Sequence, residues 1–496
     1  MKSAQVVNFP HAILGQFILM NASEATTLKP HPLRGSWIEH EIEGIYLATA
    51  PGLGVIQCQT ADGRTIGFFI GDPVDFTEGC LVLDERKVTE PPAGLDELER
   101  WIEETVYRYG GRYVFVLTSG PVKRVYVDAA GSLPLVYDKE RKVAGSTAGA
   151  IYDEDEFADR FDAALFDRMR LLEGGWFPAG LTPHRGLQRL LANFYIDLAD
   201  WTTHRHWPRD IEQNSDGPAA AERLGSSIRK GTRTFLTSGR SCLALTGGHE
   251  TRLLLATARE WASSAVFFCL SDADAARDRL ISSRLARRFG LNLRILPFPQ
   301  VTDAEAEQWM ARTGYCAGEH RYRYKGVQQL DDFDFRIGGT AGEVGRGFYW
   351  RPGDGDAALT ARDLYARLAL PADPTAEQAV ANWFDTLPTR DPLLQLDLAY
   401  LELRLSCWFA VQTYGSIGPS HAYPLISREV FTRMLQLPAE WRRANRWMIA
   451  VIRSFWPELL EVPINDLGRV RETIRLVQRA VRRPSLVARR LKRRFG

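Results

Sequence analysis

The sequence of 496 residues has few cysteines and lacks any long apolar run. Its six cysteines, at positions 58, 80, 242, 269, 316 and 407, show no C-x-x-C spacing. We therefore expect reduced, buried thiols and neither a disulfide framework nor a zinc site. No signal peptide pattern is present at the start, and no apolar run approaches the roughly 18 residues that a membrane span needs. These absences predict a cytoplasmic protein.

The two commonest nucleotide-binding fingerprints are absent as well. Neither G-x-x-x-x-G-K-[ST], whose lysine reaches the phosphates, nor G-x-G-x-x-G occurs in the chain. A nucleotide site in this protein must therefore use a different loop.

The overall composition, with 45% apolar and 25% charged residues, is that of an ordinary soluble globular protein. At this length two domains are the natural expectation. The net charge is +1, yet residues 469–496 hold eleven basic residues against one acidic residue, Glu472. Such a basic tail suits an anionic membrane surface, an acidic patch on a partner or a nucleic acid, or it is simply a solvated chain end.

Hydrophobic patterning divides the chain into two parts. Short apolar strands broken by glycine fill residues 1–150, with one helix expected at 94–109. Later, strands at 241–245, 264–270 and 291–296 alternate with helices at 249–261 and 273–289. This alternation predicts a parallel sheet covered on both faces, with ligands at the carboxyl ends of its strands. Residues 355–455 are expected to be helical throughout.

The first strand of this alternation runs into the sequence Thr-Gly-Gly-His-Glu-Thr at 246–251, where a helical pattern begins. Paired glycines let backbone amides approach an anion closely, and the free N–H groups at the start of the helix add a favourable dipole. Two threonine hydroxyls flank the turn, and Glu250 offers a carboxylate to a magnesium ion that bridges phosphates. A plain strand-to-helix turn is the alternative interpretation.

The loop resembles the Ser-Gly-Gly-x-Asp-Ser pyrophosphatase loop of the asparagine synthetase family, which includes β-lactam synthetase. Each difference keeps the functional group and adds one carbon. Three further stretches are similar to the family and follow its order: 128–137, 186–198 and 338–343. In the second, Asn193 replaces a glycine of the family pattern. In the third, Glu343 matches an acid of the family, whereas Gly339 and Gly342 replace two carboxylates.

This resemblance implies an α/β protein of two domains. Residues 1–208 would be an Ntn-hydrolase-like α+β sandwich, a remnant of the family's glutaminase domain. Residues 209–468 would be a parallel-sheet ATP-pyrophosphatase domain, of the adenine nucleotide α-hydrolase-like type, with a helical C-terminal part, and 469–496 would be the basic tail. A glutaminase of this type needs an N-terminal cysteine. Position 2 is Lys2 and the first cysteine is Cys58, so glutaminase activity is not expected.

The resemblance also implies an AMP-forming carbon–nitrogen ligase that uses ATP and Mg²⁺. It would adenylate a small-molecule or peptide carboxylate and transfer the acyl group to ammonia or to a substrate amine. Glu250 would bind the magnesium ion. The nucleotide would contact the loop and three strand ends, namely Leu245, Thr246, Gly247, Gly248, Glu250, Thr251, Phe268 and Gly338.

Three residues are candidates for a catalytic role: Glu343, Arg346 and Tyr324. Arg346 either clamps a phosphate or a substrate carboxylate, or pairs with Glu343 as a structural bridge. Tyr324 either matches a catalytic tyrosine of β-lactam synthetase or belongs to a solvated basic helix end. The family's late lysine has no counterpart, and Arg469 is a poor substitute because arginine stays protonated.

Two other functions stay open. The glycines at 339 and 342 and the missing lysine favour a catalytically inactive nucleotide-binding or scaffold protein of the same fold. The basic tail alone suggests a tRNA-modifying enzyme. The glutaminase-like first part argues against that, so nucleic acid is not an expected partner. The substrates and the oligomeric state, a homo-oligomer included, are not determined by the sequence.

Overall fold

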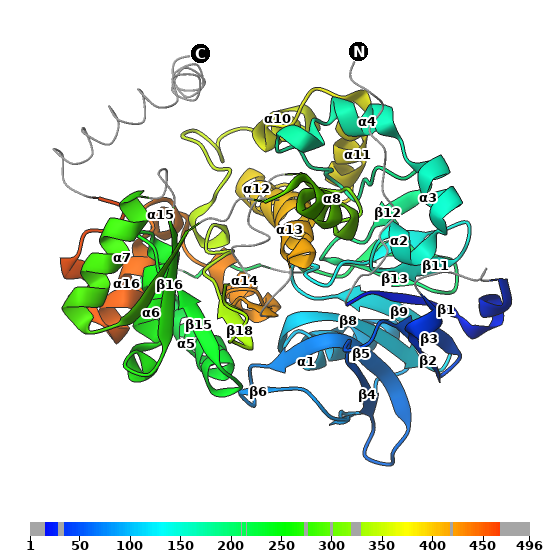
Figure 1. The fold of residues 1–496 in the computed structure, drawn as a ribbon, viewed down its shortest axis with the longest axis horizontal. Coiled ribbons are helices and arrows are strands. Elements are labelled where there is room, and N and C mark those ends of the chain that lie inside the picture. The colour runs from blue at the N-terminus through cyan, green and yellow to red at the C-terminus, as the bar shows by residue number, and fades with distance from the viewer. Residues whose placement is uncertain are drawn as a thin grey trace.

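A computed structural model of the chain describes residues 15–27, 34–209, 211–214, 216–271, 276–297, 301–318, 329–416 and 420–466. Two candidate residues, Tyr324 and Arg469, and the rest of the basic tail lie outside these ranges. The described residues form three β-sheets, two of them largely antiparallel and one parallel, with helices around them (Figure 1). The predicted α/β class is confirmed in this general form.

Six short strands form the first sheet, in the order β12-β10-β11-β1-β3-β2, and all of its pairings are antiparallel. The strands are β1 (Phe17–Asn21), β2 (Ile38–Ile42), β3 (Ile45–Thr49), β10 (Val136–Asp138), β11 (Val143–Gly145) and β12 (Leu187–Arg189). The β2–β3 hairpin turns through Glu43 and Gly44, whose φ angles of 49° and 71° suit the right-handed twist of the strands.

The second sheet has eight strands in the order β14-β13-β9-β8-β5-β4-β7, with β6 paired to β5. The strands are β4 (Val55–Gln59), β5 (Thr65–Asp75), β6 (Cys80–Leu81), β7 (Arg86–Lys87), β8 (Tyr109–Ser119), β9 (Val122–Val127), β13 (Phe194–Asp197) and β14 (Thr202–Arg205). One face shares a core with the first sheet. The other face packs against α1 (Leu95–Thr105) through Leu98, Trp101 and Ile102.

Short helices complete the first part of the chain. They are α2 (Ala148–Ile151), α3 (Glu154–Arg160) and α4 (Ala163–Arg168), with the 3-10 turns η1 (Ala22–Thr27), η2 (Arg34–Ser36) and η3 (Leu171–Glu173). Asp153 caps α3 by accepting the amide proton of Glu156, and Asp162 caps α4 by accepting that of Leu165. Local side-chain chemistry therefore sets where these helices begin.

Five parallel strands form the third sheet, in the order β17-β16-β15-β18-β19. They are β15 (Ser241–Ala244), β16 (Val266–Ser271), β17 (Asn292–Pro297), β18 (Phe335–Ile337) and β19 (Ser420–Ala422). From β15 the chain adds two strands on one side and then returns to add two on the other. The strand order reverses between β15 and β18, and open α/β sheets bind ligands at such a point.

Four helices pack on or near this sheet: α5 (Gly217–Thr237), α6 (His249–Thr257), α7 (Ala276–Phe289) and α16 (Arg446–Phe455). The others are η4 (Arg259–Trp261), α8 (Asp303–Arg312), η5 (Val344–Arg346), α10 (Ala361–Leu368), α11 (Pro374–Asp385), α12 (Pro392–Leu398), the π-helix η6 (Ala399–Phe409), α13 (Ala410–Gly415), α14 (Arg428–Leu435), α15 (Ala439–Arg443) and η7 (Pro457–Glu461). The expectation of helix throughout 355–455 is wrong at β19, because a strand of three residues is too short to show a period.

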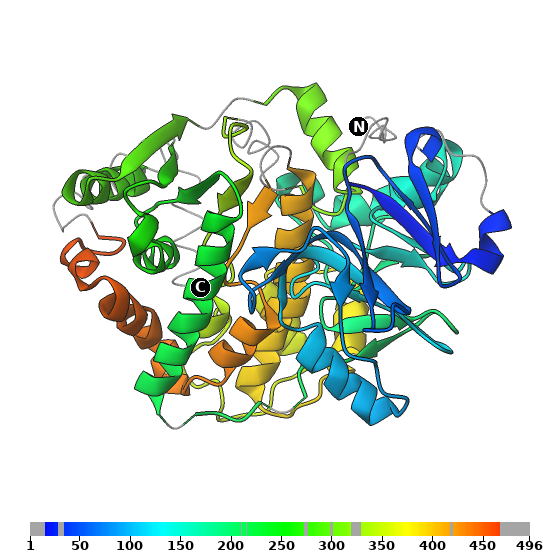
Figure 2. The same ribbon diagram turned by 90° about the horizontal axis from the view of Figure 1, so that it is seen from below.

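The C-terminal helices lie between the antiparallel sheets and the parallel sheet. Figure 1 shows α12, α13 and α14 in this central position, and in Figure 2 the same yellow and orange helices again separate the blue strands from the green part. Buried apolar residues of all three parts belong to one continuous core. The parallel sheet therefore shares its core with the antiparallel sheets and with the C-terminal helices.

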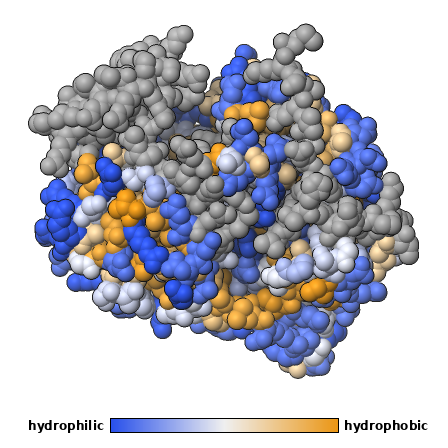
Figure 3. All heavy atoms as spheres, viewed as in Figure 1, coloured by the Kyte–Doolittle hydropathy of each residue, from blue (hydrophilic) through white to orange (hydrophobic). Residues whose placement is uncertain are grey.

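Within the described ranges no helix is both long enough and apolar enough to cross a membrane. Figure 3 shows apolar areas on one face of the molecule, interrupted by hydrophilic side chains. All six cysteines are free, and five of them are buried, as the sequence predicted; Cys80 is partly exposed.

Candidate functional site

The loop at 246–251 joins the carboxyl end of β15 to the first turn of α6, which Gly248 precedes. The hydroxyl oxygens of Thr246 and Thr251 lie 2.9 Å apart, and the amide of Thr246 donates to Thr251 Oγ1 at 3.1 Å. The amide of Gly248 donates to Thr246 Oγ1 at 3.2 Å. The two threonines thus close the turn, and the amides that start α6 have no acceptors within their own helix.

Asp278 in α7 lies against the same loop, and sequence reasoning did not find it. The amide of Gly247 donates to Asp278 Oδ1 at 3.0 Å. A Cβ atom at Gly247 would lie 2.7 Å from Ile281 Cδ1, so this glycine permits the close approach of α7. The contact shows that the loop already holds one anionic oxygen on a backbone amide.

Glu250 fills the space opposite the two glycines that follow β18. A Cβ atom at Gly339 would lie 2.7 Å from Glu250 Cβ, and one at Gly342 would lie 2.6 Å from Glu250 Cγ. Distances below 3.0 Å require the neighbouring atoms to move. The carboxylates that the family pattern places at 339 and 342 are therefore incompatible with the position that Glu250 occupies.

Arg346 joins the two carboxylates of the site. Its Nη2 atom lies 2.7 Å from Glu250 Oε1 and 3.2 Å from Glu343 Oε1. Burial raises the pKa of Glu250, Arg346 opposes this change, and Glu343 adds a smaller increase. The structure thus brings Glu250 next to Glu343 and Arg346, two residues of a single turn that follows it by more than ninety residues.

Arg442 and Trp447 hold η5, the turn that carries Arg346. Arg442 donates to the carbonyl of Val344 at 2.6 Å, and the indole of Trp447 donates to the carbonyl of Gly345 at 2.7 Å. A Cβ atom at Gly345 would lie 2.6 Å from the Trp447 ring. Arg442 and Trp447 therefore hold the turn through its backbone carbonyls, and this orients the side chains of Glu343 and Arg346.

Leu245, Phe268 and Gly338, the strand-end residues predicted to contact the nucleotide, follow or lie in the neighbouring strands β15, β16 and β18. The amide of Leu245 donates to the carbonyl of Phe268 at 2.8 Å, and the amide of Gly338 donates to the carbonyl of Ala422 at 2.9 Å. Leu245 is fully buried and Phe268 is nearly so. The side chains of both residues therefore pack in the core, and the amides of Leu245 and Gly338 already have backbone acceptors.

The donor set of the site fits a magnesium ion that also binds phosphate. No group of three or more His, Cys, Asp or Glu side chains suited to a metal occurs among the described residues. Glu250 and Glu343 are two carboxylates, and magnesium commonly uses one or two carboxylates together with phosphate oxygens. Arg346 is the cation that these carboxylates contact in the structure.

A pocket of about 240 Å³ adjoins the loop that follows β18. The sequence did not reveal most of its lining, because these residues come from four separate stretches of the chain: Trp309, Arg336, Thr340, Glu343, Tyr400, Arg404, Leu405, Trp408, Phe409, Gln412, Thr413, Ser416, His421 and Tyr423. The available signal was the presence of polar residues, Arg404 and Gln412 among them, inside a largely apolar helical run.

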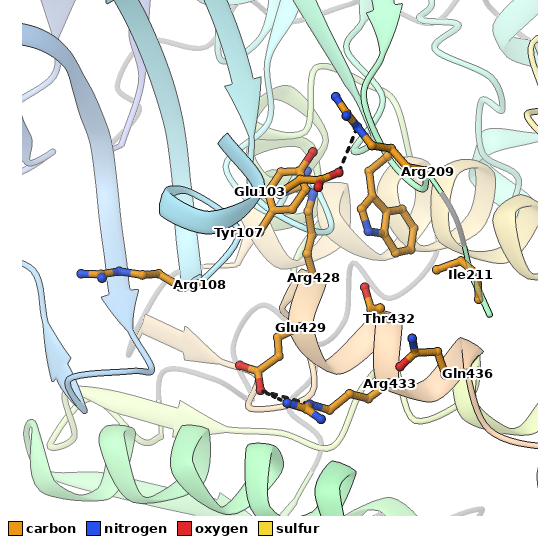
Figure 4. A pocket seen from close by; sticks show the side chains of 11 residues that line it. Glu103, Tyr107, Arg108, Arg209, Ile211, Arg428, Glu429, Thr432, Arg433 and Gln436 are labelled. Atoms are coloured by element: carbon orange, nitrogen blue, oxygen red, sulfur yellow. Dashed lines mark hydrogen bonds and ion pairs between the residues drawn. The ribbon is translucent and has the colours of Figure 1, made fainter. Parts of the chain in front are cut away.

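A larger pocket, of about 600 Å³, lies elsewhere, between α1 and α14 (Figure 4). Four of its six charged side chains pair with one another. Arg209 contacts Glu103, and Arg433 contacts Glu429, each at 3.0 Å. The pocket contains none of the candidate residues of the loop or of η5, so it is separate from the site described above.

No family model matches the chain, and no curated protein matches it. Among solved structures it is similar to the glutamine phosphoribosylpyrophosphate amidotransferase from B. subtilis, in a complex with ADP and GMP. The two are 10% identical, the match covers 60% of this chain and 65% of that chain, and the TM-score is 0.18. The chain thus matches less than two thirds of the length of that relative, and a similarity at this level assigns neither a fold family nor an activity.

Proposed function

We propose that the chain is an ATP-dependent, AMP-forming amide ligase of the asparagine synthetase type. A substrate carboxylate oxygen attacks the α-phosphorus of ATP, pyrophosphate leaves with the electrons of the broken bond, and an acyl-adenylate forms. Ammonia or a substrate amine then attacks the acyl carbon, loses a proton, and AMP leaves as the amide forms. The proposal includes no glutamine hydrolysis, since the first cysteine, Cys58, is buried within β4.

The loop at 246–251 carries this proposal. It holds two hydroxyls, two glycine amides and the start of α6 at the point where the strand order of a parallel sheet reverses. A phosphate would replace Asp278 and Thr246 as the acceptors of the two glycine amides. Such a set of fixed dipoles stabilises the negative charge that develops on a leaving pyrophosphate. Electrostatic stabilisation of that leaving group is the main requirement of the first step.

Arg346 and the two carboxylates would complete the site. Arg346 would bind phosphate oxygens bidentately once its contacts with Glu250 and Glu343 are exchanged for contacts with the nucleotide. Glu250 and Glu343 would hold Mg²⁺, which when bound neutralises phosphate charge. Arg346 would therefore balance the two carboxylates before the nucleotide binds and the phosphate charge after it has bound.

The finer division of the fold belongs to the same proposal. Residues 1–208 would be an Ntn-like sandwich, 209–468 the ATP-pyrophosphatase domain and 469–496 the basic tail. The paired antiparallel sheets before residue 206 and the parallel sheet after residue 240 support this division. The six free cysteines support a cytoplasmic location.

The alternative is a nucleotide-binding or scaffold protein without turnover, and two contacts favour it. Asp278 occupies the amide of Gly247, and Arg346 occupies the carboxylate of Glu250. Both contacts must be released before the loop can bind a phosphate and a metal. Binding of ATP alone does not distinguish the two functions, whereas release of AMP does.

The test is calorimetric titration of the full chain with Mg-ATP. Gly248→Val should abolish binding, because the added side chain blocks the approach of a phosphate. The variant should still fold, since a Cβ atom at this position meets no atom closer than 3.4 Å. Thr246→Ala should weaken binding about fivefold, the usual effect of one hydrogen bond. Thr237→Ala is the matched control, since this exposed hydroxyl at the end of α5 is remote from the loop.

Asp278→Ser provides a second arm of the same test. Removing a carboxylate next to the loop should strengthen Mg-ATP binding about fivefold, which corresponds to about 1 kcal/mol of charge repulsion in a water-like medium. Unchanged affinity of Gly248→Val for Mg-ATP would show that the loop does not bind the nucleotide. Loop-dependent binding without AMP release over a panel of carboxylates and amines would favour the inactive alternative.

A further inference from the structure

The pocket beside β18 opens next to the proposed nucleotide site. Thr340 and Glu343 line it, and both belong to the segment that packs against Glu250 and the loop. Its other walls come from α8, β18, β19, α13 and the π-helix η6, which supplies Tyr400, Arg404 and Trp408. π-Helical segments are often found at functional sites, because they alter which side chains face a common space.

Two arginines of this pocket have no carboxylate partner among the described residues. Arg336 lies with Nη2 3.4 Å from His421 Nδ1 and with its guanidinium 6.0 Å from the ring of Phe268. Arg404 stacks over Trp408 at 4.3 Å and lies 5.5 Å from the ring of Phe348. The one acidic side chain of the lining, Glu343, is already paired with Arg346. The pocket therefore carries positive charge that its own lining does not neutralise.

His421 adds a third donor. Its Nδ1 atom lies 2.8 Å from the hydroxyl of Tyr423 and 3.4 Å from Arg336 Nη2, so it accepts a hydrogen bond from one or both of them. Burial, together with Arg336 and Arg112, holds the pKa of His421 well below its usual range, so the ring is neutral. Its proton is then on Nε2, a buried atom with no hydrogen-bond partner in the described part of the chain.

The walls of the pocket are aromatic and its volume is small. Tyr423 lies directly over Gly338, where a Cβ atom would come within 2.8 Å of its ring, and it packs edge-on against Phe409. The volume of about 240 Å³ lies below the ~300–1,000 Å³ typical of sites for drug-sized ligands. Such a space fits one planar ring with a short polar group.

We propose that this pocket binds a single-ring aromatic carboxylic acid. The ring lies among Tyr400, Trp408 and Tyr423, and the carboxylate accepts hydrogen bonds from Arg336, Arg404 and His421. The assignment rests on the proposed function, because it makes this acid the carboxylate that the ligase activates. Adenine is the other planar ring that ATP would bring to the site, and the test separates the two.

The test uses phenylacetate and 3-phenylpropionate as probes, with phenylacetamide as the uncharged analogue and cyclohexylacetate as the non-aromatic one. Binding to the full chain is measured by calorimetry, with and without Mg-ATP. We expect the aromatic acids to bind and the amide to bind at least tenfold more weakly, because hydrogen bonds to a charged group are stronger than neutral ones. Cyclohexylacetate should bind more weakly than phenylacetate, and ATP should not displace either acid.

Arg336→Gln and Arg404→Gln should each weaken phenylacetate binding about tenfold. Arg453→Gln, an exposed arginine on α16, is the matched control and should leave it unchanged. Three results would overturn the assignment: no aromatic acid binds at millimolar concentration, the acid and the amide bind equally, or ATP displaces the acid. The comparison of acid with amide uses the wild type alone, so it stands even if a variant does not fold.

The two proposals fail in different ways. If Mg-ATP binds through the loop and no aromatic acid binds, the pocket assignment is wrong and the proposed ligase stands. If phenylacetate binds through Arg336 and Arg404 but Gly248→Val leaves ATP binding intact, the pocket stands as an acid site and the nucleotide loop is wrong.

Discussion

Glu250 and the two glycines opposite it form one steric unit. The glutamate is one carbon longer than the aspartate of the resembling loop pattern, and its Cβ and Cγ atoms fill the space that side chains at 339 and 342 would need. The longer acid at position 250 thus requires residues without a side chain at positions 339 and 342. The charge of the site is carried by Glu250 and Glu343 and balanced by Arg346.

This coupling predicts the result of a double-mutant cycle. Gly342→Asp should lower the free energy of unfolding by about 1–3 kcal/mol, because the new side chain overpacks against Glu250 and Met448. Glu250→Asp should be tolerated by itself, and adding it to Gly342→Asp should recover part of the loss. Urea denaturation of the four proteins measures the coupling. Strictly additive losses would show that the two positions do not interact.

The pH dependence of nucleotide binding should reveal the protonation of the Glu250 carboxyl. Burial raises the pKa of this carboxyl in the folded protein, so ionising it costs stability as the pH rises between the unfolded and folded pKa values. Binding of a cation needs the ionised form. The affinity for Mg-ATP should therefore fall as the pH decreases, beginning above the pH at which an ordinary glutamate takes up its proton. Glu250→Gln should bind weakly and lack this component, while protonation of ATP itself affects both proteins alike.

At the scale of single elements, η5 depends on a buried ion pair. Arg442 donates to Asp397 Oδ1 at 2.7 Å and also to the carbonyl of Val344, and both charged side chains are only 2% exposed. Burial raises the pKa of Asp397, and the guanidinium of Arg442 opposes this. The pair holds the turn that orients Glu343 and Arg346, without itself lying in the proposed site.

Arg442→Met should therefore destabilise the protein by about 3–5 kcal/mol, because it leaves the carboxyl of Asp397 buried without its partner. The combined change Asp397→Leu with Arg442→Met should be closer to the wild type in stability, since no buried charge is then left. Chemical denaturation checks both values. If the single variant is as stable as the wild type, the ion pair does not support η5.

At the scale of the whole molecule, the π-helix η6 connects the parts of the protein. Glu402 on this helix accepts from Asn193 Nδ2 at 2.8 Å, from the indole of Trp383 at 2.6 Å and from Arg205, which lies at the end of β14. Tyr400, Arg404 and Trp408 of the same helix line the pocket. The antiparallel part thus anchors the helix that supplies the pocket wall.

Glu402→Gln should accordingly act on both stability and binding. It removes the charge that Arg205 pairs with at a buried position, so we expect a loss of about 3–5 kcal/mol. Phenylacetate binding should weaken as well, because η6 loses its anchor, whereas Mg-ATP binding should change less. Thermal unfolding and calorimetry on the same samples test this. A loss of stability with unaltered phenylacetate affinity would separate the anchor from the pocket.

The sequence was most informative where the signal is local. The strands and helices from β15 to β17 follow the predicted ranges closely, because each has an apolar pattern of its own and ends at a turn-forming residue. The turn at the start of the stretch 128–137 is also set by local contacts. The buried carboxylate of Asp128 accepts hydrogen bonds from the amides of Ala130, Ser132 and Leu133. A three-residue strand such as β19 has no such pattern, and it was predicted as helix.

By itself the sequence determined the alternation of strands and helices, the position of the loop at 246–251 and its hydroxyl and carboxylate groups. Only the tertiary structure decided which distant residues meet there. Asp278 contacts Gly247, Arg346 contacts Glu250, and Arg336 lies beside His421 through the pairing of β18 with β19. Asn193, a departure from the family pattern, likewise binds Glu402. The physical reason is that local patterning reports burial and turns, whereas charge pairing and steric exclusion depend on which elements pack together.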